Sequence, residues 1–381
     1  MPLEIRPEYA RERAGDALVK ITKYISNRYN SLPFSIRNII TPALKPSYFA
    51  AKRFRSILSQ LQLPVYQIKG KNKWGGGVLT VLVFGEGRGI LPYLLAHLYD
   101  EKPTKKKIGK IFLGKLQSSI ESEGNGADMV LVGIDQFFAR YLSRKGFMVF
   151  PEWLMFKLDP AKPLPTGRKN KALHENLKKV RKFGYTYEIT RELSQFKHFY
   201  HHMYLPYAGN KHGDLSLVGD FTYLKKIFEK GALLLVNRGN ESLAGFLIEM
   251  DVDSISARYS GVRDGNIEYV AEGALSACYY YTISWAKEKG YKWIDFGHCR
   301  PFLNDGPFMH KKKWGMEIMK SSRLMFETKS AFGMKICNYQ NGLLEYLARN
   351  PFIALDRGKL KAMVFVRQDH PLTIEEIQAQ W

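Results

Sequence analysis

The sequence predicts a mixed α/β protein with two domains, and three observations support this prediction. The chain has 381 residues, a length that suits two ordinary domains better than one. From residue 71 onward, apolar strand-sized segments alternate with segments of helical periodicity. A proline-rich stretch, residues 158–168, interrupts this alternation near the middle of the chain. We therefore expect two mixed, twisted sheets, each flanked by helices.

The composition indicates a folded protein with an anionic partner. Apolar residues make up 45% of the chain and aromatic residues 13%, which is enough for a sizeable core. Lysine and arginine total 58 against 36 for aspartate and glutamate, a formal net charge of +22. Such an excess favours polyanions such as tRNA, an acidic carrier protein or an anionic membrane surface. Solubility alone remains the plainer explanation.

Cysteine usage and hydropathy exclude several other classes. Three cysteines without CxxC spacing indicate neither a disulfide framework nor a zinc site, and we expect no bound metal. No apolar run approaches the ~18–20 residues of a membrane helix, and the first residues are charged. We expect a cytoplasmic protein, with peripheral contact to an anionic membrane left open.

The first half is expected to contain a basic helical segment and then one domain. Residues 1–70 combine basic residues with helical periodicity, which suits either an apolar stripe packed on the body or a surface for lipid or nucleic acid. The first domain is expected over residues 71–160, followed by a linker at 161–169. Its expected elements are a strand at 78–84, a helix at 91–99, a helix at 108–121, a strand at 129–134, a helix at 136–143 and two strands within 147–158.

The second domain is expected over residues 170–381 and repeats the same theme. The central helices of the two halves are expected to begin near Ile108 and Ala271, which suggests a duplicated domain. Its expected elements are helices at 171–183, 192–204 and 221–229, a meander at 232–236, 242–250 and 254–262, a helix at 271–289, a strand at 293–296, strands within 316–327 and a closing helix at 334–348.

Residues 291–315 are the most informative segment for function. A short apolar strand ends at Gly297, and hydrogen-bonding side chains follow at once, among them His298, Arg300 and Asp305. Ligands of open α/β sheets bind in the crevice beyond strand ends. We therefore expect a reaction crevice at the end of this strand.

Two groups of residues resemble a known superfamily. Residues 107–110, followed by Tyr141-Leu142-Ser143-Arg144-Lys145-Gly146-Phe147, resemble the second half of a GNAT acyltransferase domain. Residues 176–189, 286–297 and 300–315 look like the Fem-type aminoacyl and peptidyl transferases of the GNAT superfamily. The resemblance implies two tandem GNAT-like domains, the first degenerate and the second catalytic.

The resemblance also implies a mechanism. In GNAT domains two neighbouring strands splay apart, and backbone N–H groups there hold the donor carbonyl; the matching segments here are 254–262 and 293–296. Asp295 would take a proton from the amine or hold His298 in one tautomer, although it suits the fixing of a turn equally well. His298 is the candidate base, against a surface histidine. Tyr259, or a tyrosine among 279–281, would be the acid, against simple packing.

Cationic side chains near the strand end are candidates for binding an anionic substrate. Arg300 and the lysines that follow would hold phosphate or carboxylate, with Trp314 pinning the loop; a solvated basic loop is the alternative. The predicted substrate-binding set is Arg258, Arg300, Asp305, Lys311, Lys313 and Trp314.

A second basic set would bind the donor or its carrier. It comprises two groups, one on the helix expected at 171–183 and one in a turn before the helix expected at 108: Lys178, Lys179, Arg181, Lys182, Lys107 and Gly109. That turn keeps only the last glycine of a coenzyme A motif. In the second half, the matching segment at 264–273 is acidic, which argues against coenzyme A there. We expect no tightly bound cofactor, with acyl-CoA as an alternative donor.

Together these patterns predict an N-acyltransferase. It would form an amide by moving an acyl or aminoacyl group from aminoacyl-tRNA or acyl carrier protein to an amine. An ordinary acyl-CoA-dependent N-acetyltransferase is one alternative, and a non-catalytic GNAT-fold module that binds RNA or membrane is the other.

Overall fold

The computed structural model describes residues 57–58, 60–85, 89–123, 126–167, 170–212, 218–318, 330–366, 373 and 375–376. Most of the predicted basic N-terminal segment, residues 1–56, lies outside this part. The described residues from Gln60 onward belong to one compact unit.

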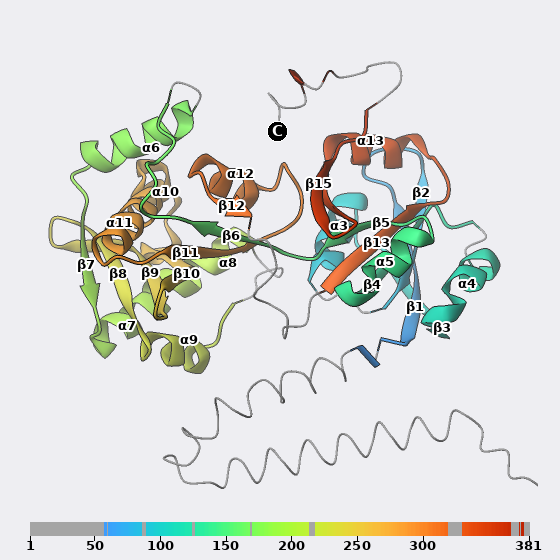
Figure 1. Ribbon diagram of the computed structural model, residues 1–381, viewed down its shortest axis with the longest axis horizontal. Coiled ribbons are helices and arrows are strands. Elements are labelled where there is room, and N and C mark those ends of the chain that lie inside the picture. Colours follow the sequence, from blue (N-terminus) through green and yellow to red (C-terminus); the bar gives the residue numbers. More distant parts are fainter. Residues whose placement is uncertain are drawn as a thin grey trace, which may run out of the picture. The chain divides into compact units, whose positions relative to one another are not determined.

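Two mixed sheets organise the described residues, as the sequence predicts, and Figure 1 labels their strands. The first sheet has the order β3-β1-β2-β4-β13-β5, in which only β2 and β4 run parallel. Its strands are β1 (Gln62–Lys71), β2 (Val78–Phe84), β3 (Thr104–Phe112), β4 (Met129–Asp135), β5 (Met148–Pro151) and β13 (Ser330–Ile336).

The second sheet has the order β12-β6-β11-β10-β9-β8-β7, in which only β10 and β11 run parallel. Its antiparallel meander β8-β9-β10 is the one that the sequence predicts. Its strands are β6 (Leu154–Leu158), β7 (Thr186–Thr190), β8 (Gly231–Arg238), β9 (Glu241–Met250), β10 (Ser254–Val262), β11 (Trp293–Cys299) and β12 (Glu317–Ile318).

The two sheets share one pattern and exchange one strand each. Read outward from the parallel pair, β3-β1-β2-β4-β13-β5 matches β8-β9-β10-β11-β6-β12 in order and in direction. The strand beside β4 is β13, from the C-terminal half, and the strand beside β11 is β6, from the N-terminal half. Two strands therefore cross the predicted linker at 161–169, and each sheet needs both halves of the chain.

Helices cover both faces of each sheet. The first sheet has one core with α3 and α13 and another with α4 and α5; the second has one core with α6 and α11 and another with α7 and α9. Strands buried on both faces read as continuous apolar runs, which is why β2, β4 and β8 are visible in the sequence. These helices are α3 (Ile90–Leu98), α4 (Leu116–Glu123), α5 (Ala139–Arg144), α6 (Lys171–Lys182), α7 (Leu193–Phe199), α9 (Phe221–Phe228), α11 (Ala274–Glu288) and α13 (Asn341–Arg349).

The remaining elements are short. They are a π-helical turn at Tyr200–Tyr204, α8 (Leu205–His212), α10 (Ile267–Glu272), α12 (Gly306–Lys313) and the hairpin of β14 (Phe352–Asp356) and β15 (Lys359–Met363). Among the described helices none is both long and apolar enough to cross a membrane.

The parallel pairs of the two sheets differ in a way that bears on function. In the first sheet, β2 pairs with β4 up to Phe84, where β2 ends, and Gly85 then lies directly against the Gly133 carbonyl. In the second sheet the β10–β11 ladder covers only Ser254–Ser256 and Trp293–Asp295, although both strands continue for several residues. We call the second sheet open, because β10 and β11 are not paired beyond Asp295. We call the first sheet closed, because the chain stays against β4 to the end of β2.

Four expectations about the elements are wrong. Residues 62–71 form a strand instead of the end of a helical segment. The helix expected at 108–121 is strand β3 up to Phe112, a lysine-rich edge strand paired with β1, and the proposed alignment of central helices from Ile108 fails with it. Lysines on an edge strand protect it from pairing with other chains, which explains why a strand carries this lysine run. The closing helix expected at 334–348 begins only at Asn341, because Met334 lies in β13.

The closed parallel pair can be tested with two glycines of similar backbone conformation. Gly85 and Gly77 have φ values of +89° and +86°, but a Cβ on Gly85 would lie 2.2 Å from the Gly133 oxygen, whereas a Cβ on Gly77 meets nothing within 4 Å. We expect Gly77→Ala to cost ~1–2 kcal/mol of unfolding free energy from backbone strain alone. Gly85→Ala should cost ~1–3 kcal/mol more from overpacking. Urea denaturation of both variants measures this; equal losses would contradict the closed pair.

Candidate active site

A pair of β-bulges creates the opening between β10 and β11. The register of β10 against β9 shifts at Arg258, and the register of β11 against β6 shifts between Asp295 and His298. Gly297 takes a φ of +81° inside the second bulge, a conformation that glycine adopts without strain. A Cβ on Gly297 would lie 3.4 Å from Cγ of Arg258, so the two bulges face each other. Because bulges bend and twist their strands, this pair separates β10 from β11.

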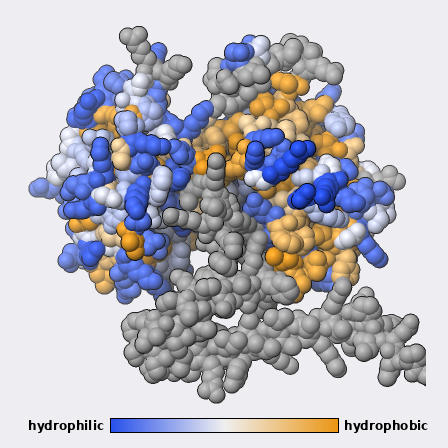
Figure 2. All heavy atoms as spheres, in the orientation of Figure 1, coloured by the Kyte–Doolittle hydropathy of each residue, from blue (hydrophilic) through white to orange (hydrophobic). Residues whose placement is uncertain are grey.

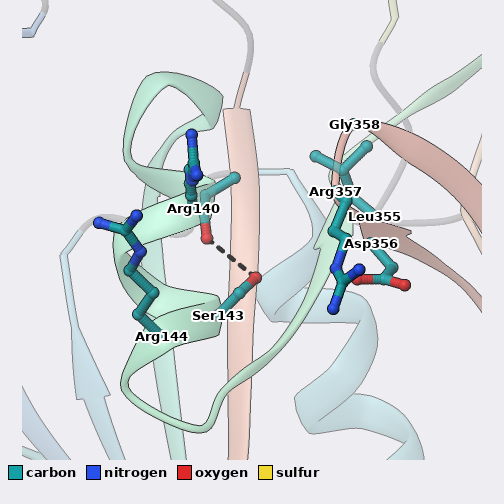
Figure 3. A pocket seen from close by; sticks show the side chains of 8 residues that line it. Arg140, Ser143, Arg144, Leu355, Asp356, Arg357 and Gly358 are labelled. Carbon is teal, nitrogen blue, oxygen red and sulfur yellow. Dashed lines mark hydrogen bonds between the residues drawn. The ribbon is translucent and has the colours of Figure 1, made fainter.

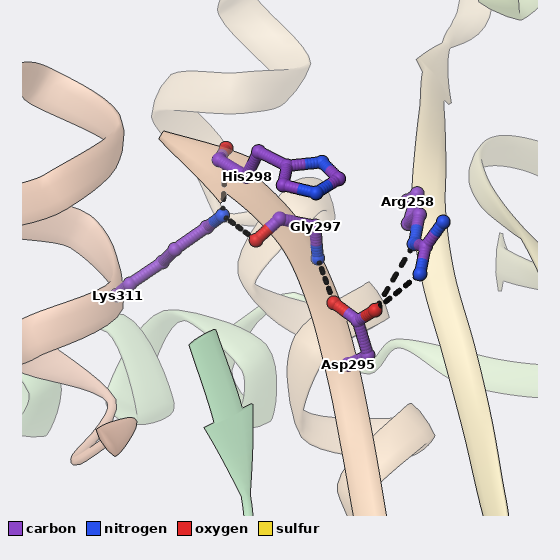
Figure 4. A network of polar contacts seen from close by, with 5 residues as sticks. All are labelled: Arg258, Asp295, Gly297, His298 and Lys311. Carbon is purple, nitrogen blue, oxygen red and sulfur yellow. Dashed lines mark hydrogen bonds and ion pairs between the residues drawn. The ribbon is translucent and has the colours of Figure 1, made fainter. Parts of the chain in front are cut away.

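An ion pair spans the opening at its narrow end. Arg258 donates to Oδ2 of Asp295 from Nη2 at 2.5 Å and from Nε at 3.1 Å, as Figure 4 shows. The second oxygen, Oδ1, accepts the Gly297 N–H at 2.7 Å. Burial opposes the charge of Arg258, but Asp295 outweighs this and raises the arginine pKa. Both Asp295 oxygens are thus engaged, which is the geometry of a carboxylate that fixes the turn.

His298 lies at the open side of the same bulge. Figure 4 shows its ring on the side of β11 that faces Arg258. The residue is exposed, and its ring lies edge-on to Trp153, with centroids 6.4 Å apart. Desolvation and, next, the charge of Arg258 lower the pKa of His298 below its usual value. The imidazole is therefore neutral at pH 7 and can accept a proton.

Lys311 holds the bulge from the other side of β11 and does not project into solvent. Only 4% of the residue is exposed, and Nζ donates to the carbonyls of Gly297 at 2.6 Å and His298 at 2.9 Å. Burial lowers the pKa of Lys311 to about 8. The sequence suggested a substrate-binding lysine, but the structure gives its ammonium to the protein's own backbone.

Arg300 and Asp305 pair with each other where a substrate was expected. Nη1 of Arg300 lies 3.3 Å from Oδ1 of Asp305, and their side chains are only 19% and 4% exposed. The guanidinium also lies over the ring of Tyr93 on α3, 4.2 Å from its centroid. Burial raises the pKa of Asp305 despite the arginine. The pair therefore anchors the segment after β11 to a helix of the first sheet.

The last two residues of the predicted substrate-binding set, Trp314 and Lys313, differ in their burial. Trp314 is fully buried and stacks on Tyr279 with centroids 5.4 Å apart, so it pins the loop, as the sequence suggests, without reaching a ligand. Lys313 is half-buried, and its carbonyl accepts a 2.7 Å hydrogen bond from Asn170. Desolvation, with a smaller contribution from Lys179, lowers the pKa of Lys313.

Tyr259 follows the β10 bulge and faces the core that contains α7 and α9. Its ring meets Tyr204 and Tyr223 edge-on, with centroids 6.0 and 6.4 Å away. Burial and a hydrogen bond with Tyr223 raise its pKa, so the hydroxyl stays protonated and can donate. The sequence gave no signal for Tyr204 or Tyr223. Tyr204 ends a π-helical turn that approaches β10 at Gly261, a geometry often found at functional sites.

The predicted donor-binding residues separate into two places. On α6, Lys178, Arg181 and Lys182 are exposed, whereas Nζ of Lys179 donates to the Ala271 carbonyl in α10 at 2.8 Å. Lys107 and Gly109 lie in strand β3 instead of a turn before a helix, so the coenzyme A turn expected there does not form.

Within the described ranges, no group of three His, Cys, Asp or Glu residues could hold a metal ion. No protein-family model matches the chain, and no curated protein matches it.

Three solved structures illustrate the similarities that were found. L-PGS from Bacillus licheniformis is 13% identical, with 78% of this chain and 93% of that chain covered and a TM-score of 0.34. FemX is 15% identical, with 72% and 85% covered and a TM-score of 0.34. A tandem GNAT protein from the clavulanic acid biosynthesis pathway is 10% identical, with 69% and 80% covered and a TM-score of 0.28. These three are proteins to which this chain is similar at low sequence identity.

The buried Lys311 predicts a pH-dependent stability. Its pKa falls from 10.5 to about 8 on folding, so between these values the unfolded chain binds more protons and stability rises with pH. Lys311→Met lacks this gain and leaves two carbonyls without a donor, which costs ~1–3 kcal/mol at pH 7. Chemical denaturation should show the gap to wild type widening from pH 8 to 10.5. Lys312→Met, at an exposed neighbour, is the control; a constant gap for Lys311→Met would refute the buried ammonium.

The Arg300–Asp305 pair predicts a loss of stability where the sequence suggested only weaker substrate binding. Arg300→Ala leaves the buried Asp305 without its partner, which should cost ~3–5 kcal/mol. Adding Asp305→Asn removes the stranded charge and should restore part of the loss. Thermal unfolding of the single and double variants tests this. If the Arg300→Ala variant is as stable as wild type, Arg300 has no anchoring role, and the substrate-binding role that the sequence suggested is favoured instead.

Proposed function

We propose that this protein is an N-acyltransferase that joins an acyl or aminoacyl group to an amine in the opening between β10 and β11. One observation supports the proposal most: the β10–β11 ladder stops after Ser256 and Asp295, while both strands continue. Backbone groups of β10 that point toward β11 have no strand partner beyond that point. Such fixed donors suit a carbonyl oxygen on which negative charge develops.

The side chains around the opening suit the proton transfers of amide formation. The amine nitrogen forms a bond to the acyl carbon, and the bond from that carbon to the carrier oxygen or sulfur breaks. His298, neutral at pH 7, accepts the proton that the amine loses. Tyr259, protonated because burial raises its pKa, donates a proton to the leaving atom. The Arg258–Asp295 pair and Lys311 position the bulge and take no part in proton transfer.

The donor is proposed to be a large anionic carrier and not coenzyme A. In the second sheet, α10 directly precedes α11, so a helical turn occupies the place of a phosphate-binding loop. Glu272 of that turn pairs with Arg238 at 2.7 Å, and Lys179 bonds to Ala271. The exposed cations of α6 and the formal charge of +22 favour a polyanion such as aminoacyl-tRNA, or else an acidic carrier protein.

A transfer assay with radiolabelled donors tests the reaction. Charged tRNA, acyl carrier protein and acyl-CoA are each offered with a mixture of primary amines, and amide product is measured. We expect transfer from one of the two carriers, and a loss of ~10²–10⁴-fold in His298→Asn, the usual contribution of a general base. Transfer from acyl-CoA alone would overturn the choice of carrier. Transfer from none of them would overturn the reaction.

The pH profile distinguishes a base at His298 from a structural histidine. Activity should rise with pH through the lowered pKa of His298, because the neutral ring is the active form. Arg258→Met removes the positive neighbour, so this limb should move to higher pH. Arg263→Met, which breaks a 3.3 Å ion pair with Glu241 elsewhere in the sheet, is the matched control and should leave the limb in place. An unmoved limb in Arg258→Met would exclude His298 as the titrating group.

A further inference from the structure

A cationic groove lies on the first sheet, between α5 and the β14–β15 hairpin (Figure 3). Its volume is about 840 Å³. No role in the proposed reaction involves it, and the predicted substrate- and donor-binding residues do not line it. It is lined by Ala139, Arg140, Ser143, Arg144, Leu355, Asp356, Arg357 and Gly358.

Three arginines give the groove its charge. Arg140 and Arg144 are four residues apart on α5, so they share one face of the helix, and Arg357 comes from the opposite wall. All three are exposed, and within the described residues none forms an ion pair with a carboxylate. The one acid of the lining, Asp356, pairs with Lys361 at 2.6 Å, and the pKa of Asp356 is lowered by Lys361 and, to a smaller extent, by the charge of Arg357. Three guanidinium groups therefore remain available to an anion.

Arg357 occupies a backbone position that does not suit arginine. It has a φ of +48° in a two-residue turn, because Asp356 pairs directly with Lys359. Turns of this kind favour asparagine, aspartate or glycine. Residues in strained backbone conformations cluster at functional sites. The strain at Arg357 therefore makes its guanidinium a candidate for ligand binding.

An exposed aromatic ring lies one turn before Arg140. Phe137 is 67% exposed and precedes Arg140 by three residues, so the two share a side of the helical segment. Figure 2 shows strongly hydrophilic residues over α5 with hydrophobic residues around them. A ring beside guanidinium forks is the combination that binds a single nucleic-acid strand, whose bases stack and whose phosphates accept paired hydrogen bonds.

We infer that this groove binds single-stranded RNA, with Arg140, Arg144 and Arg357 on successive phosphates and Phe137 stacked on a base. The inference selects an RNA carrier over a protein carrier as the donor. It rests on the proposed function only in assigning the bound RNA this role; the binding itself does not depend on the reaction. An acidic protein would satisfy the arginines, but it gives the exposed ring no base to stack on. Inorganic phosphate would use the charge and leave most of the groove empty.

Fluorescence anisotropy with a labelled, uncharged 12-nucleotide RNA tests the inference on the full chain, without any transfer reaction. We expect the triple variant Arg140→Ala, Arg144→Ala, Arg357→Ala to bind more weakly and to lower the slope of log affinity against log salt by about 2, since each phosphate contact to a single strand contributes ~0.7. The triple variant Lys226→Ala, Lys230→Ala, Lys287→Ala removes the same charge from exposed sites of the second sheet and should keep the slope.

Two further variants separate binding from folding. Arg357→Gly suits the turn, so it should leave thermal stability equal or higher while it lowers the salt slope by about 0.7. Phe137→Ala should weaken binding by about 5- to 150-fold, the range for loss of one stacked base, with the slope unchanged.

The outcomes decide between the groove and its alternatives. An unchanged slope in the arginine triple variant would overturn the inference, as would equal loss of slope in the lysine control. If the arginine triple variant loses binding of inorganic pyrophosphate but keeps RNA binding, the groove is a small-anion site and the inference is wrong. If the wild-type protein binds acyl carrier protein but not RNA, the groove is a protein-docking site and the inference is again wrong. If the protein binds RNA through the groove but transfers no acyl group, the inference about the groove is supported and the proposed reaction is wrong.

Discussion

The separation of β10 from β11 depends on how the bulge at Gly297 is held. Lys311 donates to the carbonyls of Gly297 and His298, and Asp295 accepts the Gly297 N–H while it pairs with Arg258. These contacts satisfy backbone groups that a neighbouring strand would otherwise bind. A buried carbonyl without a donor is costly, so these side chains stabilise the bulge of β11 that borders the opening. The lowered pKa of Lys311 is one consequence of this arrangement.

The exchange of β6 and β13 places the rest of the structure around this opening. β6 lies beside β11 and pairs with it on both sides of the bulge, through Lys157 and Met155. Trp153, just before β6, packs near His298. Arg300, just after β11, reaches Tyr93 of α3. The site is thus built by both halves of the chain, although only the second sheet is open. The first sheet keeps the same strand order with Gly85 closed against Gly133, which leaves its surface for a different task.

The sequence predicted the parts of the fold in which local pattern and burial agree. The meander up to Val262, the helix at 171–183 and the strand at 293 have strong apolar periodicity, and the structure contains them. It failed where a long-range contact decides: β3 reads as a basic turn and helix until it pairs with β1, and the end of β13, from Met334, reads as helix until it enters the first sheet. The site shows the same division. The sequence drew attention to residues 295–300, which the structure places beside the opening, but a lysine run gives no sign that Lys311 alone is buried.

Amide hydrogen exchange in the presence of a donor analogue shows whether the acyl carbonyl binds between β10 and β11. The probe is a short RNA that carries an amino acid through a non-hydrolysable 3′-amide. If the acyl carbonyl binds in the opening, amides of β10 after Ser256 should gain protection, and those of β2 near Phe84 should not. Protection confined to the first sheet, or no change in β10 at saturating probe, would contradict the account.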